Sequence, residues 1–189
     1  MSATAVDRPP EAAPRLLVAA GLGAAVAVAL GVYGRVHDPS QELVFTLFFS
    51  STISMKVWLA SVALLFGVTQ VLTALWVYGK LPVEAPPWAG TAHRISGRMA
   101  FIVSLPVAYH CLWSLGFQDS TTRVLAHSLL GCAFYGAMAT KLLALRATRL
   151  PKWSIPVIGA TLVTTLTGIF LTSSLWFFTT VDFPALPHG

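Results

Sequence analysis

Five long apolar runs, separated by short loops, constrain this chain more than any other feature of its sequence. They cover residues 16–34, 56–78, 98–115, 124–145 and 155–178. A helix needs about 20 mostly apolar residues to cross the hydrocarbon core of a bilayer. Only 10% of the residues are charged, whereas a soluble domain carries roughly 25%. We therefore predict an all-α fold, an integral membrane bundle of about five transmembrane helices.

The flanking segments set the domain organisation. Residues 1–15 are rich in Ala, Pro and charge, a composition typical of a disordered cytoplasmic tail. No small-residue cleavage site follows the first run, so we interpret that run as a retained helix and not as a secretion signal. Residues 16–178 then form a single transmembrane domain, and 179–189 a short extracytoplasmic tail. The apolar segment 44–55 is too short to span, so it is an interfacial or re-entrant piece or an extension of the second helix.

Basic residues in the loops predict the orientation. The larger set falls in the N-terminal tail and in the second and fourth loops: Arg8, Arg15, Lys80, Arg94, Arg98, Arg146, Arg149 and Lys152. The opposite side holds only Arg35, Lys56 and Arg123. Lys and Arg concentrate in cytoplasmic loops, so we predict an N-terminus inside and a C-terminus outside the membrane. The net charge of +5 does not indicate nucleic-acid binding, because the basic residues are spread between apolar runs.

Two histidines, His110 and His127, lie inside the third and fourth runs. Ionisable residues in membrane helices usually face the bundle interior and mark function. The loop 116–123 joins the two helices, and at about 1.5 Å per residue both histidines reach nearly the same depth, nearer the outer face. Two facing imidazoles suit a six-coordinate haem iron. Gly131, one turn after His127, leaves room where a porphyrin would press. The alternative is simple polar packing between helices.

His93 begins the third helix beside Arg94 and Arg98. Three interpretations stay open for this group: His93 as a haem ligand, the arginines as partners of haem propionates, or the whole cluster as a contact for lipid phosphate. Across the hairpin, the candidate partners nearest to His93 are Lys141 and Met138.

The remaining polar residues have weaker signals. Gln70, central to the second run, is predicted to bond a neighbouring helix, with a quinone or a haem edge as alternatives. Cys111 and Cys132 lie in apolar runs and are expected to be packing residues without a disulfide. His37 and His188 are expected to be solvated. The sequence has no Walker loop, no G-x-G-x-x-G and no C-x-x-C, so nucleotide, iron–sulfur and covalent haem binding lack support.

Two stretches carry a family resemblance. HRISGRMAFIVSLPVAYHCLWSLGF (93–117) and TRVLAHSLLGCAFYGAMATKLLALR (122–146) resemble membrane b-type cytochromes of the cytochrome b561 and ferric-reductase-like kind. The whole chain also resembles small multi-pass membrane proteins of high-GC bacteria, which implies a bacterial cytoplasmic membrane. The cytochrome resemblance implies haem b, with His93, His110 and His127 as haem-side positions. The fourth run has a single histidine, so the pattern fits one haem, or a degenerate fold without haem, better than two haems.

The predicted function is a haem-b electron-transfer subunit, with His110 and His127 as axial ligands. Bis-histidine ligation leaves no open iron position, which favours electron transfer over oxygen chemistry. Such a subunit would exchange electrons with a redox partner protein or quinone and would not be a stand-alone enzyme. The alternative is a haem-free structural or anchoring subunit of a membrane complex. A small transporter is disfavoured, because no broken helix pair or inverted repeat is evident.

Overall fold

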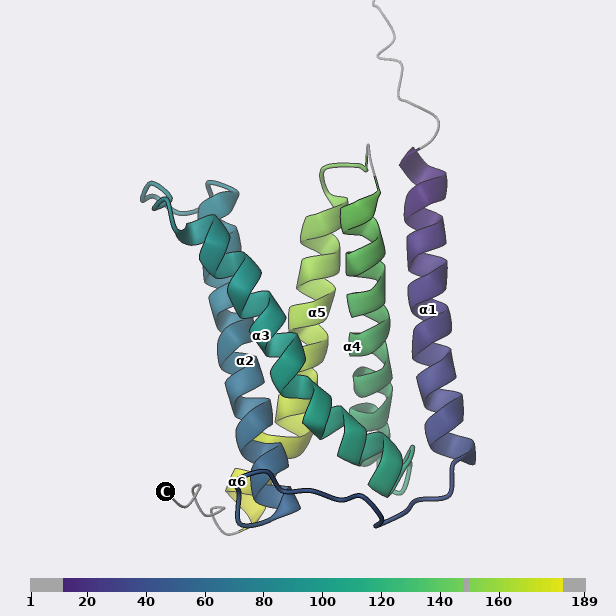
Figure 1. Ribbon diagram of the computed structural model, residues 1–189. Helices are drawn as coiled ribbons and strands as arrows, with labels where there is room; N and C mark the ends of the chain where they lie inside the picture. Colours follow the sequence, from purple (N-terminus) through teal and green to yellow (C-terminus); the bar gives the residue numbers. More distant parts are fainter. Residues whose placement is uncertain (1–11, 148–149, 182–189) are drawn as a thin grey trace, which may run out of the picture.

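The computed structural model describes residues 12–147 and 150–181, and within these ranges every regular element is helical (Figure 1). The helices are α1 (Ala12–Val36), α2 (Thr52–Val77), α3 (Ala89–His110), α4 (Thr122–Arg146), α5 (Ser154–Phe170) and α6 (Trp176–Thr180). Two π-helical turns interrupt them. One, η1 (Cys111–Leu115), continues α3, and the other, η2 (Leu171–Leu175), joins α5 to α6. The predicted all-α class is confirmed for the described residues.

Five helical segments in the described ranges are long and apolar enough to cross a membrane. They are Ala13–Val36, Thr52–Val77, Ala89–Leu115, Thr122–Arg146 and Ser154–Thr180. Each contains or closely overlaps one predicted run, although α3 begins at Ala89, earlier than expected. Only 11% to 33% of the most apolar window of each segment is buried inside the protein. Their outward faces are therefore apolar, as a lipid environment requires.

The ends of the chain differ slightly from expectation. Helix α1 begins at Ala12, so the last residues of the predicted tail are helical, and residues 1–11 lie outside the described part. Helix α6 ends at Thr180, and residues 182–189, most of the predicted C-terminal tail, are likewise outside it. The apolar segment 44–55 divides: its residues from Thr52 onward extend α2, whereas residues 37–51 form an irregular loop.

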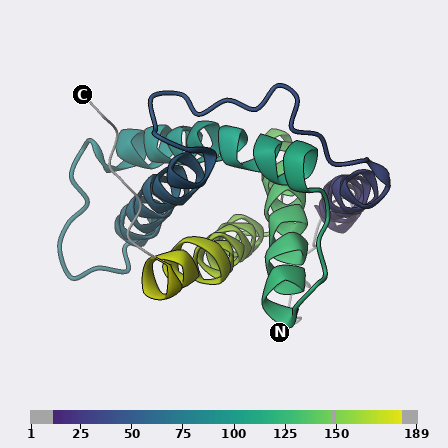
Figure 2. The same ribbon diagram turned by 90° about the horizontal axis from the view of Figure 1, so that it is seen from below.

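The helices pack in the order α1, α4, α5, α2, α3. Helix α3 lies against α2 at its start and then crosses the bundle obliquely, so that its end comes near the lower end of α4 (Figure 1). The view from below shows the 37–51 loop passing outside α3 and η1 (Figure 2). Because α3 is oblique, it shares few backbone contacts with α4, its neighbour in the chain.

Helices α1 and α4 approach each other through glycines. A Cβ added to Gly136 would lie 2.6 Å from the carbonyl oxygen of Gly23 and 2.8 Å from the Cβ of Ala27. A Cβ on Gly23 would lie 2.5 Å from the carbonyl oxygen of Gly136 and would also clash with the Thr140 hydroxyl. No side chain fits at either position, so the two backbones touch directly, as small residues allow in membrane helices.

Candidate functional site

His110 ends α3 and is fully buried, with 0% of its surface exposed. Its Nδ1 lies 2.9 Å from the carbonyl oxygen of Pro106, and its Nε2 lies 3.2 Å from the backbone nitrogen of Phe45. A carbonyl only accepts and a backbone N–H only donates, so the ring is neutral with its proton on Nδ1. Both nitrogens of His110 are therefore in hydrogen bonds.

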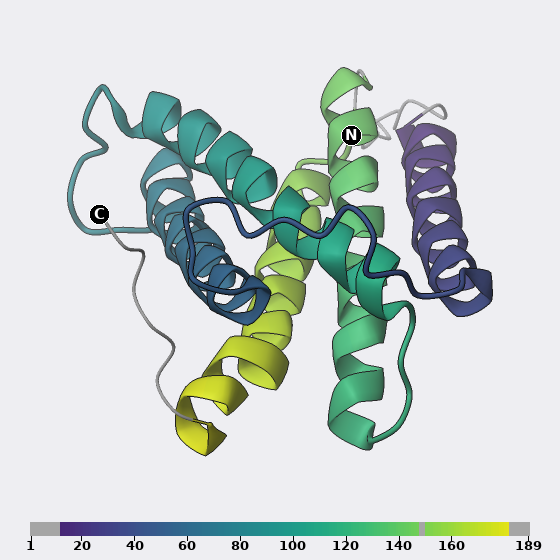
Figure 3. The ribbon, with the colours of Figure 1, turned by 60° about the horizontal axis from the view of Figure 1, so that its bottom comes forward.

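The Phe45 contact is one of several by which the 37–51 loop packs over η1. Figure 3 shows this loop crossing α3. The π-turn moves its carbonyls off the α-helical pattern, so they are open to other donors. The backbone N–H of Ser40 donates to Trp113 O (3.2 Å), and Gln41 Nε2 donates to Ser114 O (3.3 Å). In return, Trp113 Nε1 donates to Glu42 O (3.1 Å). The loop is thus fixed on the end of α3 by side chains and backbone together.

His37 belongs to this closure too, so the prediction that it is solvated is wrong. Its ring is half-buried, and its Nε2 donates to Trp113 O at 3.2 Å. The ring stacks on Tyr33, with centroids 5.0 Å apart, and contacts the tilted Trp113 ring at 4.6 Å. His188 lies outside the described residues.

His127 faces the α5–η2 segment, whereas His110 faces the 37–51 loop. Its Nδ1 lies 3.2 Å from the hydroxyl of Thr172, and that hydroxyl lies 2.7 Å from the carbonyl oxygen of Gly168. The hydroxyl proton goes to the carbonyl, so Thr172 accepts from the imidazole and His127 carries its proton on Nδ1. Arg123, one turn earlier, donates to Thr172 O (2.6 Å) and lies 3.8 Å above the Trp176 ring.

The hydrogen bonds of His110 and His127 therefore lead to different parts of the molecule. Within the part of the chain that is described, the two rings share no hydrogen bond and no ring contact. The link between α3 and α4 is instead Tyr135, whose hydroxyl lies 2.8 Å from that of Ser104. Residues 12–147 and 150–181 also contain no group of three or more His, Cys, Asp or Glu that could hold a metal ion.

Gly131 borders open space. A Cβ added there would meet no heavy atom within 4 Å. At about 100° per residue, Gly131 lies roughly 40° from His127 and roughly 40° from Tyr135 around the helix axis. Since His127 faces α5 and Tyr135 faces α3, Gly131 faces the region between those two helices. This is the position where the sequence predicted room for a flat ligand.

His93 takes its hydrogen-bond partner from α2, while Lys141 of α4, one of the two neighbours expected across the hairpin, lies within electrostatic range of the ring. Its Nδ1 lies 3.0 Å from the Thr73 hydroxyl, which in turn donates to Thr69 O (2.6 Å). The start of α3 packs on α2, and so the side chains of α2 are the nearest hydrogen-bonding groups to His93. Thr73 accepts the Nδ1 proton, in the same way as Thr172 does for His127.

Gln70 supports the same contact, one turn before Thr73. Its Nε2 donates to the carbonyl oxygen of His93 and to Ser96 Oγ, the latter at 2.8 Å. The prediction that Gln70 bonds a neighbouring helix is confirmed. Gly97 completes the contact, because a Cβ there would lie 3.0 Å from Gln70 Oε1. The spacing of Gln70 and Thr73 on one face of α2 could have indicated this pair.

Arg94 and Arg98 lie on the outer side of α3. Both are exposed, and Arg94 Nη2 donates to Thr91 Oγ1 at 3.0 Å. Arg98 lies 110 − 98 = 12 residues before His110, or about 18 Å along the helix axis. The arginines therefore lie far along α3 from the His110 ring. Cys111 and Cys132 are free thiols, as expected.

In residues 12–147 and 150–181 the fold is a bundle of helices, five of which are long and apolar enough to cross a membrane. The chain belongs to a family of unknown function, DUF6529, whose model matches residues 16–185. No curated protein and no solved structure matches the chain. The family carries no link to b-type cytochromes, so the resemblance seen in the sequence stays a hypothesis.

Proposed function

We propose that the chain is a membrane-embedded haem-b electron-transfer subunit, with His110 and His127 as axial ligands between α3 and α4. One observation carries this proposal: both imidazoles donate Nδ1–H to an oxygen of a helix. The lone pair is then on Nε2, which is the form in which an imidazole binds iron. Iron-binding histidines typically have the other ring nitrogen fixed in this way.

The two proposed ligands differ in what already bonds their imidazole rings. Nδ1 of His127 is bonded to Thr172, the backbone of Ile169 also bonds the ring, and Gly131 leaves space one turn further along α4. Nε2 of His110 accepts from Phe45, so ligation requires the loop to give up one bond of 3.2 Å. A bound haem b would supply one-electron transfer. The work of this chain is to hold the two imidazoles and to exclude water with the 37–51 loop.

Two basic residues near His127 are better placed to bind haem propionates than Arg94 and Arg98 are. Arg123 and Lys56 lie within electrostatic range of His127, whereas Arg94 and Arg98 are at the far end of α3. Arg123 is held by Thr172 O and the Trp176 ring, which fixes its position. We assign the propionate role to Arg123 and Lys56, and leave lipid contact to Arg94 and Arg98.

We further propose a bacterial cytoplasmic membrane as its location, and the distribution of Lys and Arg supports an orientation with the N-terminus inside and the C-terminus outside. The histidine pair then lies near the outer face. An electron donor or acceptor would be a quinone or a partner protein on either side.

The absorption spectrum of the protein, purified in mild detergent after expression with haem available, tests the proposal. We expect a Soret band and the sharp α and β bands of low-spin haem b on reduction. His127→Gln should remove them. His110→Gln is the matched variant, because a glutamine oxygen can still accept from Phe45 N–H. It should lose the low-spin bands while the protein stays folded. His188→Ala is the control and should leave the spectrum unchanged.

A haem-free structural or anchoring subunit is the second candidate, and the Phe45 bond favours it. In that case His110 serves only to close the 37–51 loop over η1. The wild type would then be colourless and well folded, and His110→Leu, which cannot accept from Phe45, would be less stable than His110→Gln. A colourless wild type with this stability order would replace the cytochrome proposal.

A further inference from the structure

The loop between α1 and α2 has an apolar surface in its second half. Leu43, Leu47 and Phe48 have 75%, 55% and 63% of their surface exposed. No charged residue occurs between Glu42 and Lys56. Three large apolar side chains therefore lie on the surface of the protein, on a segment that is not helical.

Two of these residues, Leu43 and Leu47, are in the left-handed backbone conformation, with φ of 58° and 52°. A bulky residue in this conformation costs free energy that glycine would not cost. Contacts with the end of α3 hold the backbone in place, but they do not require leucine side chains. Neither leucine recovers the cost by packing inside the protein, because more than half of each is exposed. An apolar environment outside the protein would recover it.

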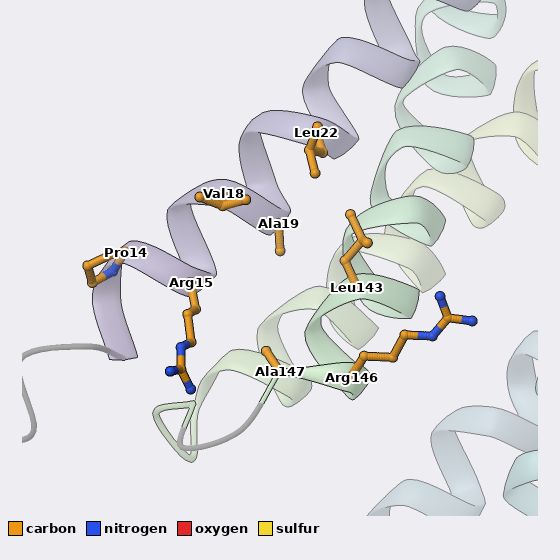
Figure 4. A pocket seen from close by; sticks show the side chains of 8 residues that line it. All are labelled: Pro14, Arg15, Val18, Ala19, Leu22, Leu143, Arg146 and Ala147. Carbon is orange, nitrogen blue, oxygen red and sulfur yellow. The ribbon is translucent and has the colours of Figure 1, made fainter.

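Exposed apolar residues on the helices need no such explanation. Val18 and Leu22 line an open groove between α1 and α4 and are also exposed (Figure 4). They have ordinary helical backbone, so an apolar side chain costs nothing there. The two loop leucines are different, because the apolar side chain is kept at a position that favours glycine.

The loop also lies beside the last turns of a predicted span. It passes outside α3 and η1 (Figure 2), and it bonds Tyr109 and His110, which are inside the span Ala89–Leu115. Tyr109 is 115 − 109 = 6 residues before the end of that span, or about 9 Å along the helix axis. The apolar surface of the loop is therefore at the depth of the lipid-facing surface of α3.

The backbone of the same segment bonds toward the protein. The N–H of Phe45 donates to His110 Nε2 (3.2 Å), and the carbonyl oxygen of Leu43 accepts from the Tyr109 hydroxyl (3.4 Å). Irregular backbone is tolerated at membrane depth only where the protein satisfies its polar groups. The loop combines bonded backbone groups on its inner side with apolar side chains on its outer side, as such a position requires.

We propose that residues 43–48 insert into the bilayer at the η1 end of the bundle, with Leu43, Leu47 and Phe48 among the acyl chains just below the head groups. The partner is the lipid surface itself, recognised by apolar contact and not by charge. Insertion anchors the loop that covers His110. The proposal rests on the five apolar spans lying in a bilayer, and it does not depend on haem.

Spin labels on the full-length protein in nanodiscs of phosphatidylcholine and phosphatidylglycerol test the depth of the loop. The labels are attached to single cysteines in a Cys111→Ala/Cys132→Ala background. Two variants place the label on the loop, one on the exposed centre of α2, and one on the exposed loop between η1 and α4: Leu43→Cys, Phe48→Cys, Leu65→Cys and Ser120→Cys. Power-saturation EPR then compares collisions with oxygen, which concentrates in lipid, and with a water-soluble nickel chelate.

We expect the labels at Leu43 and Phe48 to favour oxygen over the nickel chelate and to lie about 5–10 Å below the phosphates. The label at Leu65 should lie deeper. The label at Ser120, at the same end of the bundle but on a polar loop, should favour the nickel chelate. Either of the two loop labels is sufficient for the test if the other variant does not fold.

Loop labels that the nickel chelate reaches as readily as it reaches Ser120 would place the segment in water and overturn the proposal. Labels that neither reagent reaches would mean that a second copy of the chain or a partner protein covers the segment, and would overturn it as well.

Discussion

The contacts α1–α4 and α2–α3 join their helices by opposite means. Between α1 and α4, glycines let the backbones touch, and no hydrogen bond between side chains of these two helices is present in the described residues. Between α2 and α3, side chains form the contact: Gln70 and Thr73 bond His93 and Ser96.

In lipid, the burial of apolar surface does not drive helices to associate, so packing and hydrogen bonds must do so. Hydrogen bonds in membrane bundles average about 0.6 kcal/mol, whereas overpacking a tight contact costs about 1–3 kcal/mol. The backbone contact should therefore be the more sensitive of the two.

Gly136→Val should have the largest effect. Its side chain would enter the space of Gly23 O and Ala27 Cβ, and backbone atoms cannot move aside. We expect a loss of about 3 kcal/mol in the free energy of unfolding, the upper end for overpacking. Unfolding in mixed detergent and SDS measures it, and protease access to α1 shows whether that helix has separated.

The matched control is Gly21→Val, on α1 itself, where an added Cβ meets nothing within 4 Å. It should change stability by less than about 1 kcal/mol, because only helix propensity and lipid contact differ. If the two valine variants lose the same stability, the close approach of α1 and α4 is not what holds α1 in place.

Gln70→Leu should have a smaller effect. It removes the bonds to His93 O and Ser96 Oγ but keeps a side chain of similar size. Ser96 keeps its bond to Ala92 O (2.7 Å), so no buried donor is left alone. We expect a loss of about 1 kcal/mol, within the range for hydrogen bonds between membrane helices. A loss as large as that of Gly136→Val would show that side-chain hydrogen bonds, and not backbone contact, dominate this bundle.

These contacts also show what the sequence could predict. Hydropathy found all five spans, because each helix must hide its own backbone from lipid. Gln70 was correctly assigned to a neighbouring helix, since a lone amide in an apolar run needs a partner. Depth along the hairpin predicts Lys141 near His93, and Lys141 is within electrostatic range, but depth says nothing about the oblique path of α3, so it does not predict the hydrogen bond to Thr73 on α2. The glycine contact was missed although Ala19, Gly23, Ala27 and Gly31 recur at every fourth position.

Nothing in the sequence predicts that the 37–51 loop packs over His110. The loop group that bonds His110 is the backbone N–H of Phe45, and every residue except proline carries such a group. The loop around Phe45 turns at Leu43 and Leu47, with φ of 58° and 52°. This left-handed conformation is normally taken by glycine or asparagine. Two leucines in it are specified by contacts with the end of α3, such as the bond from Tyr109 to Leu43 O at 3.4 Å, and not by local sequence.

Gly97→Ala should hardly change the free energy of unfolding of the wild type, and its effect should depend on whether Gln70 is present. The added Cβ would lie 3.0 Å from Gln70 Oε1, the mobile end of a side chain. Alanine gains about 1 kcal/mol of helix propensity over glycine, and the crowding of Gln70 offsets it. In a Gln70→Ala background the crowding is gone, so the same substitution should stabilise by about 1 kcal/mol. Thermal unfolding of the four proteins in one detergent measures this coupling. Equal effects in both backgrounds would mean that Gly97 is not required for the approach of Gln70.

Gly131→Leu should leave stability almost unchanged, and for that reason it separates structure from function. No heavy atom lies within 4 Å of an added Cβ, so the larger side chain enters open space, and leucine favours a helix more than glycine does. We expect an unfolding free energy within about 1 kcal/mol of the wild type. Under the proposed function, the same leucine occupies the space beside His127 that the haem needs, so the low-spin bands should disappear.

Gly159→Leu is the control, because Gly159 on α5 also has nothing within 4 Å but lies away from both histidines in the chain. It should keep both the fold and the spectrum. A Gly131→Leu protein that retains the wild-type haem spectrum would place the haem elsewhere in the bundle, and the open face of α4 would then be only a lipid-accessible surface.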